Sequence, residues 1–301
     1  MLSFLTALLA VWAISAELWR DAIQAAPPAT EVFVAALSVR DGKVSVGEPE
    51  NISRSPGYDN QPFFAPDGAT LFFTSDRAPG QMEIYRYDLE TRRVSRVTTT
   101  PESEYSPTVT PDGKHISVIR VEADGTQRLW KFGIDGRDPV LVLQDVKPVG
   151  YHAWLDEHTL VLFVLGRPAT LQAADVNTGK AEVVTQDIGQ SIQRMPTGGV
   201  SFVQQAGETG ARILTISEAT KQSGKIVTRP LTTVVAGARQ AHVAWTPDGT
   251  LLMAHEGTLH AWKAGEPGWR AVADLEALGL RNVTRLAVSP SGDRIAIVAT
   301  D

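Results

Sequence analysis

Short apolar runs separated by turn residues dominate the stretch 58–88, and the rest of the chain can be compared with it. Apolar, strand-forming residues at Phe63–Phe64 and Leu71–Phe73 flank the triplet Pro66-Asp67-Gly68. Proline and Asp suit the corners of a type I turn, and Gly suits the φ > 0 position that follows, so the triplet predicts a bulged hairpin. Two more runs of strand-forming residues follow, at Ile84–Tyr87 and Val94–Val97. The stretch therefore predicts a four-stranded antiparallel unit of about 45 residues, the size of a propeller blade.

The turn pattern recurs along the chain at the spacing of a repeat. A second Pro-Asp-Gly triplet begins at Pro111, 45 residues after Pro66, and a third begins at Pro247. Weaker copies occur at Pro196, at Pro290 and in the proline-free segment Tyr151–His158. We therefore predict an all-β fold, a six-bladed β-propeller of four-stranded antiparallel blades.

Each end of the repeat array holds half a blade. The segment 31–51 predicts two strands with no hairpin before them, and the segment 285–298 predicts two strands with nothing after them. Together they make one composite blade, in which the C-terminal pair supplies the first two strands and the N-terminal pair the last two. Closing the ring in this way removes exposed sheet edges. The alternative is an open solenoid, which would need capping repeats at its ends.

The N-terminal segment Met1–Ala16 is apolar and carries no charge. It is shorter than the roughly 20 residues of a membrane-spanning helix, and it has the length of a signal-peptide core. No Lys or Arg precedes Arg20, so an amphipathic or buried N-terminal helix is the alternative. We expect residues 1–28 to be a signal peptide, or an apolar segment, plus a linker. We expect residues 29–301 to form a single propeller, periplasmic or secreted, with no stable membrane span after cleavage.

Composition and charge narrow the range of partners. The formal net charge is −6 and no Lys/Arg-rich run occurs, so nucleic acid is not an expected partner. The chain has no cysteine, which excludes disulfides, thiolate metal sites and cysteine nucleophiles. We expect the protein to be a monomer.

Sequence patterns of known catalytic sites are weak in this chain. The segment Gly189–Gln193 lacks the closing glycine of a nucleophile elbow, and there is no P-loop or G-x-G-x-x-G motif. No two histidines have the helical spacing of a zinc protease. We therefore predict no catalytic set, no metal and no cofactor. Trp154 and Trp245 lie just before hairpin turns and are expected to pack between blades.

One constellation of polar residues follows from propeller geometry. The first strand of each blade lines the central channel, so residues equally far ahead of their turns reach one level. That level comprises Gln61, Ser106, Tyr151, Ser191, His242 and Arg285. Asp59 and Glu104 come just before it, and Tyr105 and His152 are its neighbours. From these positions we predict a ligand-binding funnel lined by Asp59, Gln61, Glu104, Tyr105, Tyr151, His152, His242 and Arg285. The alternative is a polar, water-filled channel with no ligand.

The stretch Phe63–Arg77, followed by Glu83–Asp88, resembles the repeat of TolB-type propellers. That repeat combines a Pro-Asp-Gly hairpin, an apolar strand, Ser-Asp-Arg and an Ile-Tyr strand. The likeness is close over 53–98 and 99–145, fair over 240–275 and 285–298, and poor over 146–231. Such propellers occur in periplasmic binding proteins, in gating domains of prolyl-oligopeptidase-like hydrolases and in some lyases. TolB proper carries an α/β domain before its propeller. Here 30 residues precede Glu31, so that domain is not expected.

The leading functional hypothesis is non-enzymatic binding of a protein segment or small ligand at the funnel. The alternative is a lyase or hydrolase that acts on a polyanion in the same funnel. In that alternative Arg285 would neutralise charge and His242 or Glu104 would transfer protons. A third hypothesis is a purely structural module that uses loops on its outer faces.

Overall fold

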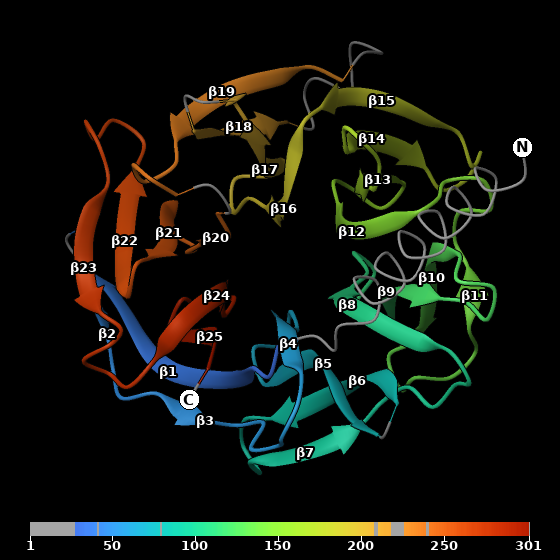
Figure 1. Ribbon diagram of the computed structural model, residues 1–301, viewed down its shortest axis with the longest axis horizontal. Coiled ribbons are helices and arrows are strands. Elements are labelled where there is room, and N and C mark those ends of the chain that lie inside the picture. Colours follow the sequence, from blue (N-terminus) through green and yellow to red (C-terminus); the bar gives the residue numbers. More distant parts are fainter. Residues whose placement is uncertain are drawn as a thin grey trace, which may run out of the picture.

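The computed structural model describes residues 28–300, apart from 41, 79, 208–209, 218–225 and 239–240. Over these residues the chain folds into six antiparallel sheets arranged around a central axis (Figure 1), as the sequence predicted. The predicted signal peptide lies outside the described residues, except for Pro28. In the described part of the chain, no helix has the length and apolarity needed to cross a bilayer.

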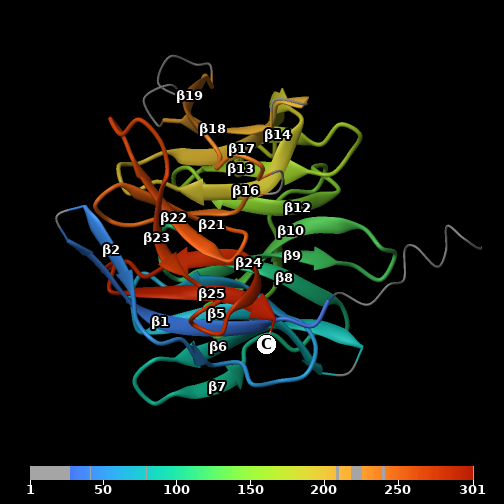
Figure 2. The same cartoon turned by 60° about the vertical axis from the view of Figure 1, so that its left-hand side comes forward.

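Five blades are built from consecutive strands, with the first strand next to the axis and the fourth at the rim (Figures 1 and 2). Blade 1 contains β4 (Asp59–Phe64), β5 (Thr70–Ala78), β6 (Gln81–Asp88) and β7 (Arg93–Arg96). Blade 2 contains β8 (Ser103–Val109), β9 (His115–Val121), β10 (Gln127–Gly133) and β11 (Val140–Leu141). Blade 3 contains β12 (Val149–Trp154), β13 (Thr159–Val164), β14 (Thr170–Asp175) and β15 (Ala181–Gln186). Blade 4 contains β16 (Ile188–Arg194), β17 (Val200–Gln205), β18 (Ala211–Ile216) and β19 (Thr228–Thr233). Blade 5 contains β20 (Val243–Trp245), β21 (Thr250–His255), β22 (Thr258–Lys263) and β23 (Arg270–Asp274).

Blade 6 is the composite blade that closes the ring. Its strands, from the axis outward, are β24 (Arg281–Val288), β25 (Arg294–Thr300), β1 (Glu31–Arg40) and β2 (Lys43–Val46). The short strand β3 (Glu50–Asn51) also pairs with β1. Strands β1 and β25 are antiparallel, and their register runs from Glu31 opposite Ala299 to Ala36 opposite Arg294. The predicted closure by the two ends of the chain is therefore confirmed.

The hairpin turns have the geometry that their residues predict. Gly68, Gly113 and Gly249 all have positive φ, between 69° and 82°. In blade 1 the Asp67 carboxylate accepts hydrogen bonds from the amides of Ala69 and Thr70, at 2.8 and 3.0 Å. These bonds satisfy backbone donors that the turn would otherwise leave unpaired.

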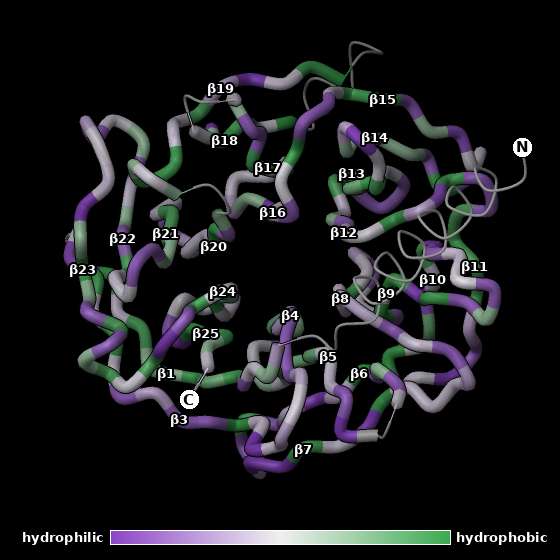
Figure 3. Tube along the Cα trace, viewed as in Figure 1, coloured by the Kyte–Doolittle hydropathy of each residue, from purple (hydrophilic) through white to green (hydrophobic). Residues whose placement is uncertain are grey.

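Apolar residues of the middle strands form the core between adjacent blades, and Figure 3 shows hydrophobic positions concentrated on those strands. The two tryptophans that were expected to pack between blades also connect blades through their indole nitrogens. Trp154 Nε1 of blade 3 donates to Ser117 Oγ of blade 2 at 3.0 Å. Trp245 Nε1 of blade 5 donates to Ser201 Oγ of blade 4 at 2.8 Å. Each pair satisfies a polar indole group within an otherwise apolar contact.

The first strands of most blades carry β-bulges beside the axis. In β4 the register moves from Asn60 opposite Thr74 to Phe63 opposite Phe72, so two residues face one. Gln61 at this bulge has a φ of 57°, and Ser106 at the matching bulge in β8 has a φ of 55°. A bulge turns a side chain away from the normal alternation of a strand, and here it determines which residues face the channel.

Candidate binding site in the central channel

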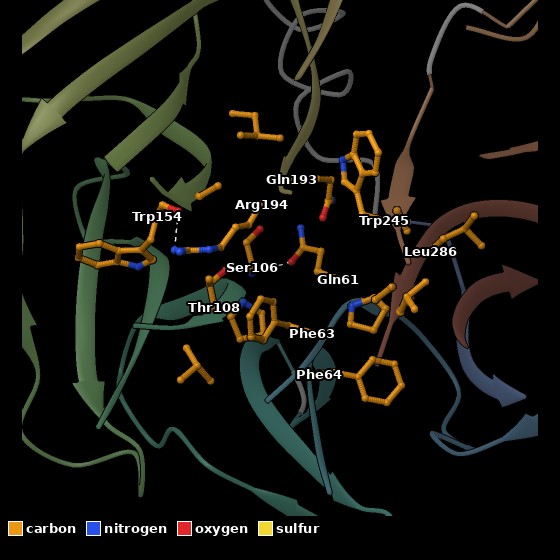
Figure 4. A pocket seen from close by; sticks show the side chains of 18 of the residues that line it. Gln61, Phe63, Phe64, Ser106, Thr108, Trp154, Gln193, Arg194, Trp245 and Leu286 are labelled. Atoms are coloured by element: carbon orange, nitrogen blue, oxygen red, sulfur yellow. Dashed lines mark hydrogen bonds between the residues drawn. The ribbon is translucent and has the colours of Figure 1, made fainter. Parts of the chain in front are cut away.

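The centre of the ring holds a cavity of about 700 Å³, lined by residues from all six blades. Five prolines of the hairpin turns contribute to its lining and are exposed, so the cavity opens between these turns: Pro66, Pro111, Pro196, Pro247 and Pro290. Figure 4 shows side chains from several blades converging on it. The volume lies within the range of about 300–1,000 Å³ that is usual for ligand sites.

The lining residues form two levels, defined by their distance from the turns. The inner level lies deeper and comprises Gln61, Ser106, Tyr151, Gln190, His242 and Arg285. The mouth level lies two residues before each turn and comprises Phe64, Val109, Trp154, Arg194, Trp245 and Val288. The inner level is mainly polar, and the mouth level is mainly apolar with one arginine. A ligand that enters between the turns would meet the mouth level first.

Arg285 is the centre of the inner level. Its Nη2 donates to Tyr151 Oη at 2.6 Å, and its Nη1 lies 3.4 Å from His242 Nδ1. The guanidinium carbon lies 4.8 Å from the centroid of the Tyr151 ring, which is a cation–π contact. Tyr151 itself packs edge-on against Phe163, with the ring centroids 5.8 Å apart. Residues of blades 3, 5 and 6 thus hold one guanidinium in a defined position.

The groups around Arg285 are electrically neutral. Burial, together with the positive charge of Arg285, holds the pKa of His242 well below its usual value, so the imidazole is neutral near pH 7. Its Nδ1 can therefore accept from the guanidinium. Burial also raises the pKa of Tyr58, which lies near Arg285, and this phenol stays protonated. Among the described residues, no carboxylate lies within ion-pair distance of Arg285.

Asp59 and Glu104, predicted to face the funnel, lie outside the cavity lining and are fully buried. Asp59 Oδ1 accepts from Arg77 at 3.3 Å, and Glu104 Oε1 accepts from Arg120 Nε at 2.9 Å. Both acids precede the bulge of their strand, where the alternation of side chains is opposite to that of the residues after it. Their carboxylates contact arginines of the second strand of their own blade, and neither side chain lines the cavity.

Burial raises the pKa of both carboxyl groups, that of Asp59 to about 6 and that of Glu104 to about 7. The arginine partners lower these pKa values, but burial outweighs them. Glu104 also accepts a hydrogen bond from Thr100 Oγ1 at 2.7 Å and lies close to Glu83, whose carboxylate raises its pKa further. These acids form part of the buried structure of blades 1 and 2.

The other two predicted neighbours differ in position. Tyr105 is partly buried against the core between blades 2 and 3 and does not line the cavity. His152 lines the cavity but is only 6% exposed, and its Nε2 lies 2.7 Å from Ser117 Oγ. Burial lowers the pKa of His152 to about 3, so this imidazole is neutral. Its Nδ1 has no hydrogen-bond partner among the described residues.

Blade 4 contributes residues that the sequence prediction missed. Ser191, predicted at the inner level, is buried, and its Oγ accepts from the amide of Val243 at 3.1 Å. A bulge between Ile188 and Ile192 places Gln190 in the lining instead. Arg194 lies at the mouth level, where its Nη1 donates to the carbonyl of Trp154 at 3.4 Å (Figure 4). Arg194 stands two residues before Pro196, the position that Trp245 holds before Pro247, so this spacing could have identified it.

The described lining carries no carboxylate. Among the described residues, the lining contains no Asp or Glu, and no cluster of three or more His, Asp or Glu is placed to hold a metal ion. Of the two residues proposed as alternatives for proton transfer, His242 lines the cavity, and Glu104 is buried in its ion pair outside the lining. The lining presents two guanidinium groups, two imidazoles, neutral amide and hydroxyl groups, and aromatic rings.

Comparisons with known proteins agree with this architecture. Residues 42–147 match the family model of the TolB β-propeller domain. A structure from Agrobacterium tumefaciens described as a TolB superposes with a TM-score of 0.66 at 15% identity, covering 90% of this chain and 99% of that one. TolB from Acinetobacter baumannii gives a TM-score of 0.57 at 13% identity, covering 96% of this chain and 68% of that one.

One curated relative is an uncharacterized protein of Agrobacterium fabrum, strain C58. It is 27% identical over 81 residues, which is 27% of this chain and 27% of the relative. The matched region is therefore a small part of both proteins. The structural likenesses, all below 25% identity, establish the fold.

Proposed function

We propose, from the premise that the chain is a TolB-like six-bladed β-propeller, that it is a non-enzymatic binding protein. Its ligand would be a segment of a partner protein that enters the central channel between the hairpin turns. The observation that carries this proposal is the cavity of about 700 Å³, to which all six blades contribute side chains and which is open at the turns. Concave sites with an apolar wall and a few converging polar groups are typical ligand sites.

The wall of the channel is held by bonds between blades, which supports a preformed site. Gln61 Oε1 of blade 1 accepts from the Ser106 amide of blade 2 at 2.8 Å (Figure 4). Ser191 of blade 4 accepts from the Val243 amide of blade 5 at 3.1 Å. Such bonds fix neighbouring first strands relative to each other. A preformed site loses less conformational entropy when its ligand binds.

The mixture of groups in the lining suits a peptide. The partly exposed ring of Trp245 at the mouth can contact side chains. Amides such as those of Gln61, Gln190 and Gln193 can bond to a peptide backbone. The cavity volume would admit a few residues of an extended segment.

Selection from a displayed library of random peptides would test this function. Peptides selected on the wild-type protein should bind the control variant Val183→Trp, because Val183 is 55% exposed on rim strand β15. The same peptides should lose binding to Thr108→Trp, because Thr108 lines the cavity and an indole there would fill it. Thermal melting of both variants would establish that each is folded. Peptides that bind all three proteins equally well would contradict a channel site.

We further propose that the protein acts in the periplasm or outside the cell, on the basis of the uncharged apolar segment Met1–Ala16. Cell fractionation with N-terminal sequencing would test this. A mature N-terminus between the apolar segment and Glu31, in the periplasmic or secreted fraction, is expected. An intact Met1 on protein in the cytoplasmic fraction would contradict it.

A further inference from the structure

We infer that the segment bound in the channel presents an acidic side chain, whose carboxylate pairs with Arg285. This inference rests on the proposed function and adds to it the chemical class of the partner. It comes from a contrast between the charge of the whole chain and the charge of the cavity. The chain has 34 acidic and 28 basic residues, yet among the described residues the lining holds two arginines and no acid.

Among the described residues, no side chain next to Arg285 balances its positive charge. Its contacts to Tyr151 Oη and His242 Nδ1 orient the guanidinium but supply no negative charge. An arginine stays protonated at any ordinary pH, so its charge has to be balanced by water, by ions or by a ligand. A partly exposed guanidinium with no carboxylate partner, in a cavity, favours an anionic ligand.

The guanidinium of Arg285 is held in place and keeps donors for a ligand. The ring of Tyr151 supports one face of it, and the two hydrogen bonds use part of its donors. An arginine has five N–H donors in a planar fork, so donors remain for a ligand. A carboxylate matches this fork by accepting two parallel hydrogen bonds, and the fixed guanidinium loses little entropy on binding it.

The path into the cavity passes a second arginine. Arg194 lies at the mouth level, between the turns and the inner level. A negatively charged group moving inward would therefore pass one guanidinium before it reached the other. Trp245 is partly exposed at the same mouth level and can pack against apolar residues next to the acidic one, whereas Trp154 is buried between blades 2 and 3.

The number of arginines in the cavity favours a peptide ligand over a repeating polyanion. A polyanionic saccharide or nucleic acid carries a charge on each unit and is usually held by a row of cations. The described lining offers only two arginines, at different levels, among aromatic and amide groups. One or two acidic residues within an apolar peptide match this distribution better than a uniformly charged polymer does.

The acidic side chain can be tested with pairs of peptides in which one member has Asp or Glu and the other has the corresponding amide. From the library described above, peptides that bind wild-type protein but not Thr108→Trp would be sequenced and remade with each Asp or Glu changed to the amide. The channel-dependent peptides should be enriched in Asp or Glu at one position. The amide version should bind wild-type protein at least about tenfold more weakly, since a hydrogen bond between charged groups is lost.

Arg285→Gln should weaken the acidic peptide by a similar factor and should bind the acidic and amide versions almost equally. Arg281→Gln is the matched control, because Arg281 is exposed on the same strand and lies outside the lining. This control has the same change in net charge and should keep wild-type affinity. Arg285→Lys should retain part of the preference for the acidic peptide.

The outcomes separate the two proposals. Channel-dependent peptides without enrichment in acid, whose affinity is unchanged by Arg285→Gln, would overturn the acidic partner and leave the channel function standing. Failure to obtain any peptide that depends on an open channel would overturn both. If Arg285→Gln did not fold, the acid and amide peptides compared on wild-type protein would still decide the matter.

Discussion

Blades 1 and 2 each pair a half-buried or buried arginine with a carboxylate of the same blade, whereas Arg285 of blade 6 has no such partner among the described residues. Arg77 lies over Phe73 and Tyr85 of its own blade, and Arg120 lies over Trp130 and Phe132 of its own blade. Each of the two also pairs with a fully buried carboxylate of that blade. Arg285 also lies over an aromatic ring, but the ring belongs to Tyr151 of another blade, and its hydrogen-bond partners are neutral.

The comparison shows how the same packing of arginine on an aromatic ring serves two purposes. Inside a blade, the carboxylate and the guanidinium compensate each other, and removing one leaves the other buried without a partner. At the axis, the guanidinium keeps its charge and can change partners. An arginine paired within its blade therefore belongs to the scaffold, whereas Arg285 is available to a ligand.

The largest loss of stability is expected when the closure of the ring in blade 6 is removed. Deleting residues 30–50 removes β1 and β2, exposes the edge of β25 and uncovers the core that Phe33 and Ile297 share. We expect the free energy of unfolding to fall by several kcal/mol, on the order of the whole stability of a marginal domain, and aggregation to increase. Thermal denaturation followed by circular dichroism would measure this. A truncated protein that melted like the full chain would show that β1 does not stabilise the ring.

The next largest loss of stability is expected when an arginine that pairs with a carboxylate of its own blade is replaced. Arg120→Gln removes the cationic partner of Glu104, whose pKa is already raised to about 7, so this buried carboxyl group can take up a proton and lose only its hydrogen bond. We expect the free energy of unfolding to fall by about 1–3 kcal/mol. Urea denaturation would measure the loss. Peptide affinity, measured where the variant is still folded, should stay close to that of wild type, because Arg120 does not line the cavity. A stability loss below about 1 kcal/mol would mean that the pair contributes little to the scaffold.

A smaller effect is expected from the titration of Glu104, whose pKa is raised to about 7 in the folded protein. Since the folded state holds this proton more tightly than the unfolded state, stability is greatest below the ordinary pKa and is lost as the pH rises through about 7. Glu104→Gln should therefore show a flatter decline in stability between about pH 5 and about pH 8 than wild type. Urea denaturation across this range would measure it. An equal slope in both proteins would contradict the raised pKa.

The titration of His152 should change stability with pH in the opposite direction to that of Glu104, because burial lowers the pKa of His152 to about 3. The unfolded state then binds the proton more tightly, so its contribution to stability is lost as the pH falls from about 6.5 toward 3. Comparison of Glu104→Gln with wild type at one pH cancels this contribution, which both proteins share.

The smallest effect on stability is expected at Arg285. Arg285→Gln should change the free energy of unfolding by less than about 1 kcal/mol, since no buried carboxylate loses its partner and Gln can still donate a hydrogen bond. Thermal melting of Arg285→Gln beside Arg120→Gln would measure this contrast directly. A loss at Arg285 equal to that at Arg120 would place Arg285 in the scaffold and remove the distinction between the two regions.

The fold could be predicted because its signals are local. The turn triplets beginning at Pro66 and Pro111 specify hairpins by their own backbone preferences, and their spacing counts the blades. The half-blades at the two ends of the chain also followed from such signals. Blade 3 forms a similar hairpin without proline, with Asp156 accepting from the His158 amide at 2.8 Å. That weaker copy was found because its flanking runs of apolar residues are intact.

The candidate site could be predicted only in part, because bulges determine it. Counting back from the turns identified Gln61, Tyr151, His242 and Arg285, which all line the cavity. The same count could not show where the alternation of side chains reverses. A bulge leaves no unique residue type in the sequence: Gln61 and Ser106 both adopt φ near 55°, and neither is glycine. For the same reason, the direction in which Asp59 and Glu104 point depended on pairing that the sequence does not reveal.

Because of the composite blade, the first and the last of the described strands to be synthesised must pair with each other. Strand β1 is made first of all the described strands, but its partner β25 is made last, since Ala299 follows Glu31 by 268 residues. At about 5–20 residues per second, a ribosome needs about 13–54 seconds to cover that distance. Throughout this time the edge of β1 that will face β25 has no native partner, while β2 and β3 can already cover the other edge. The five other blades can form one after another as they emerge, so the ring would keep one gap until β24 and β25 are made.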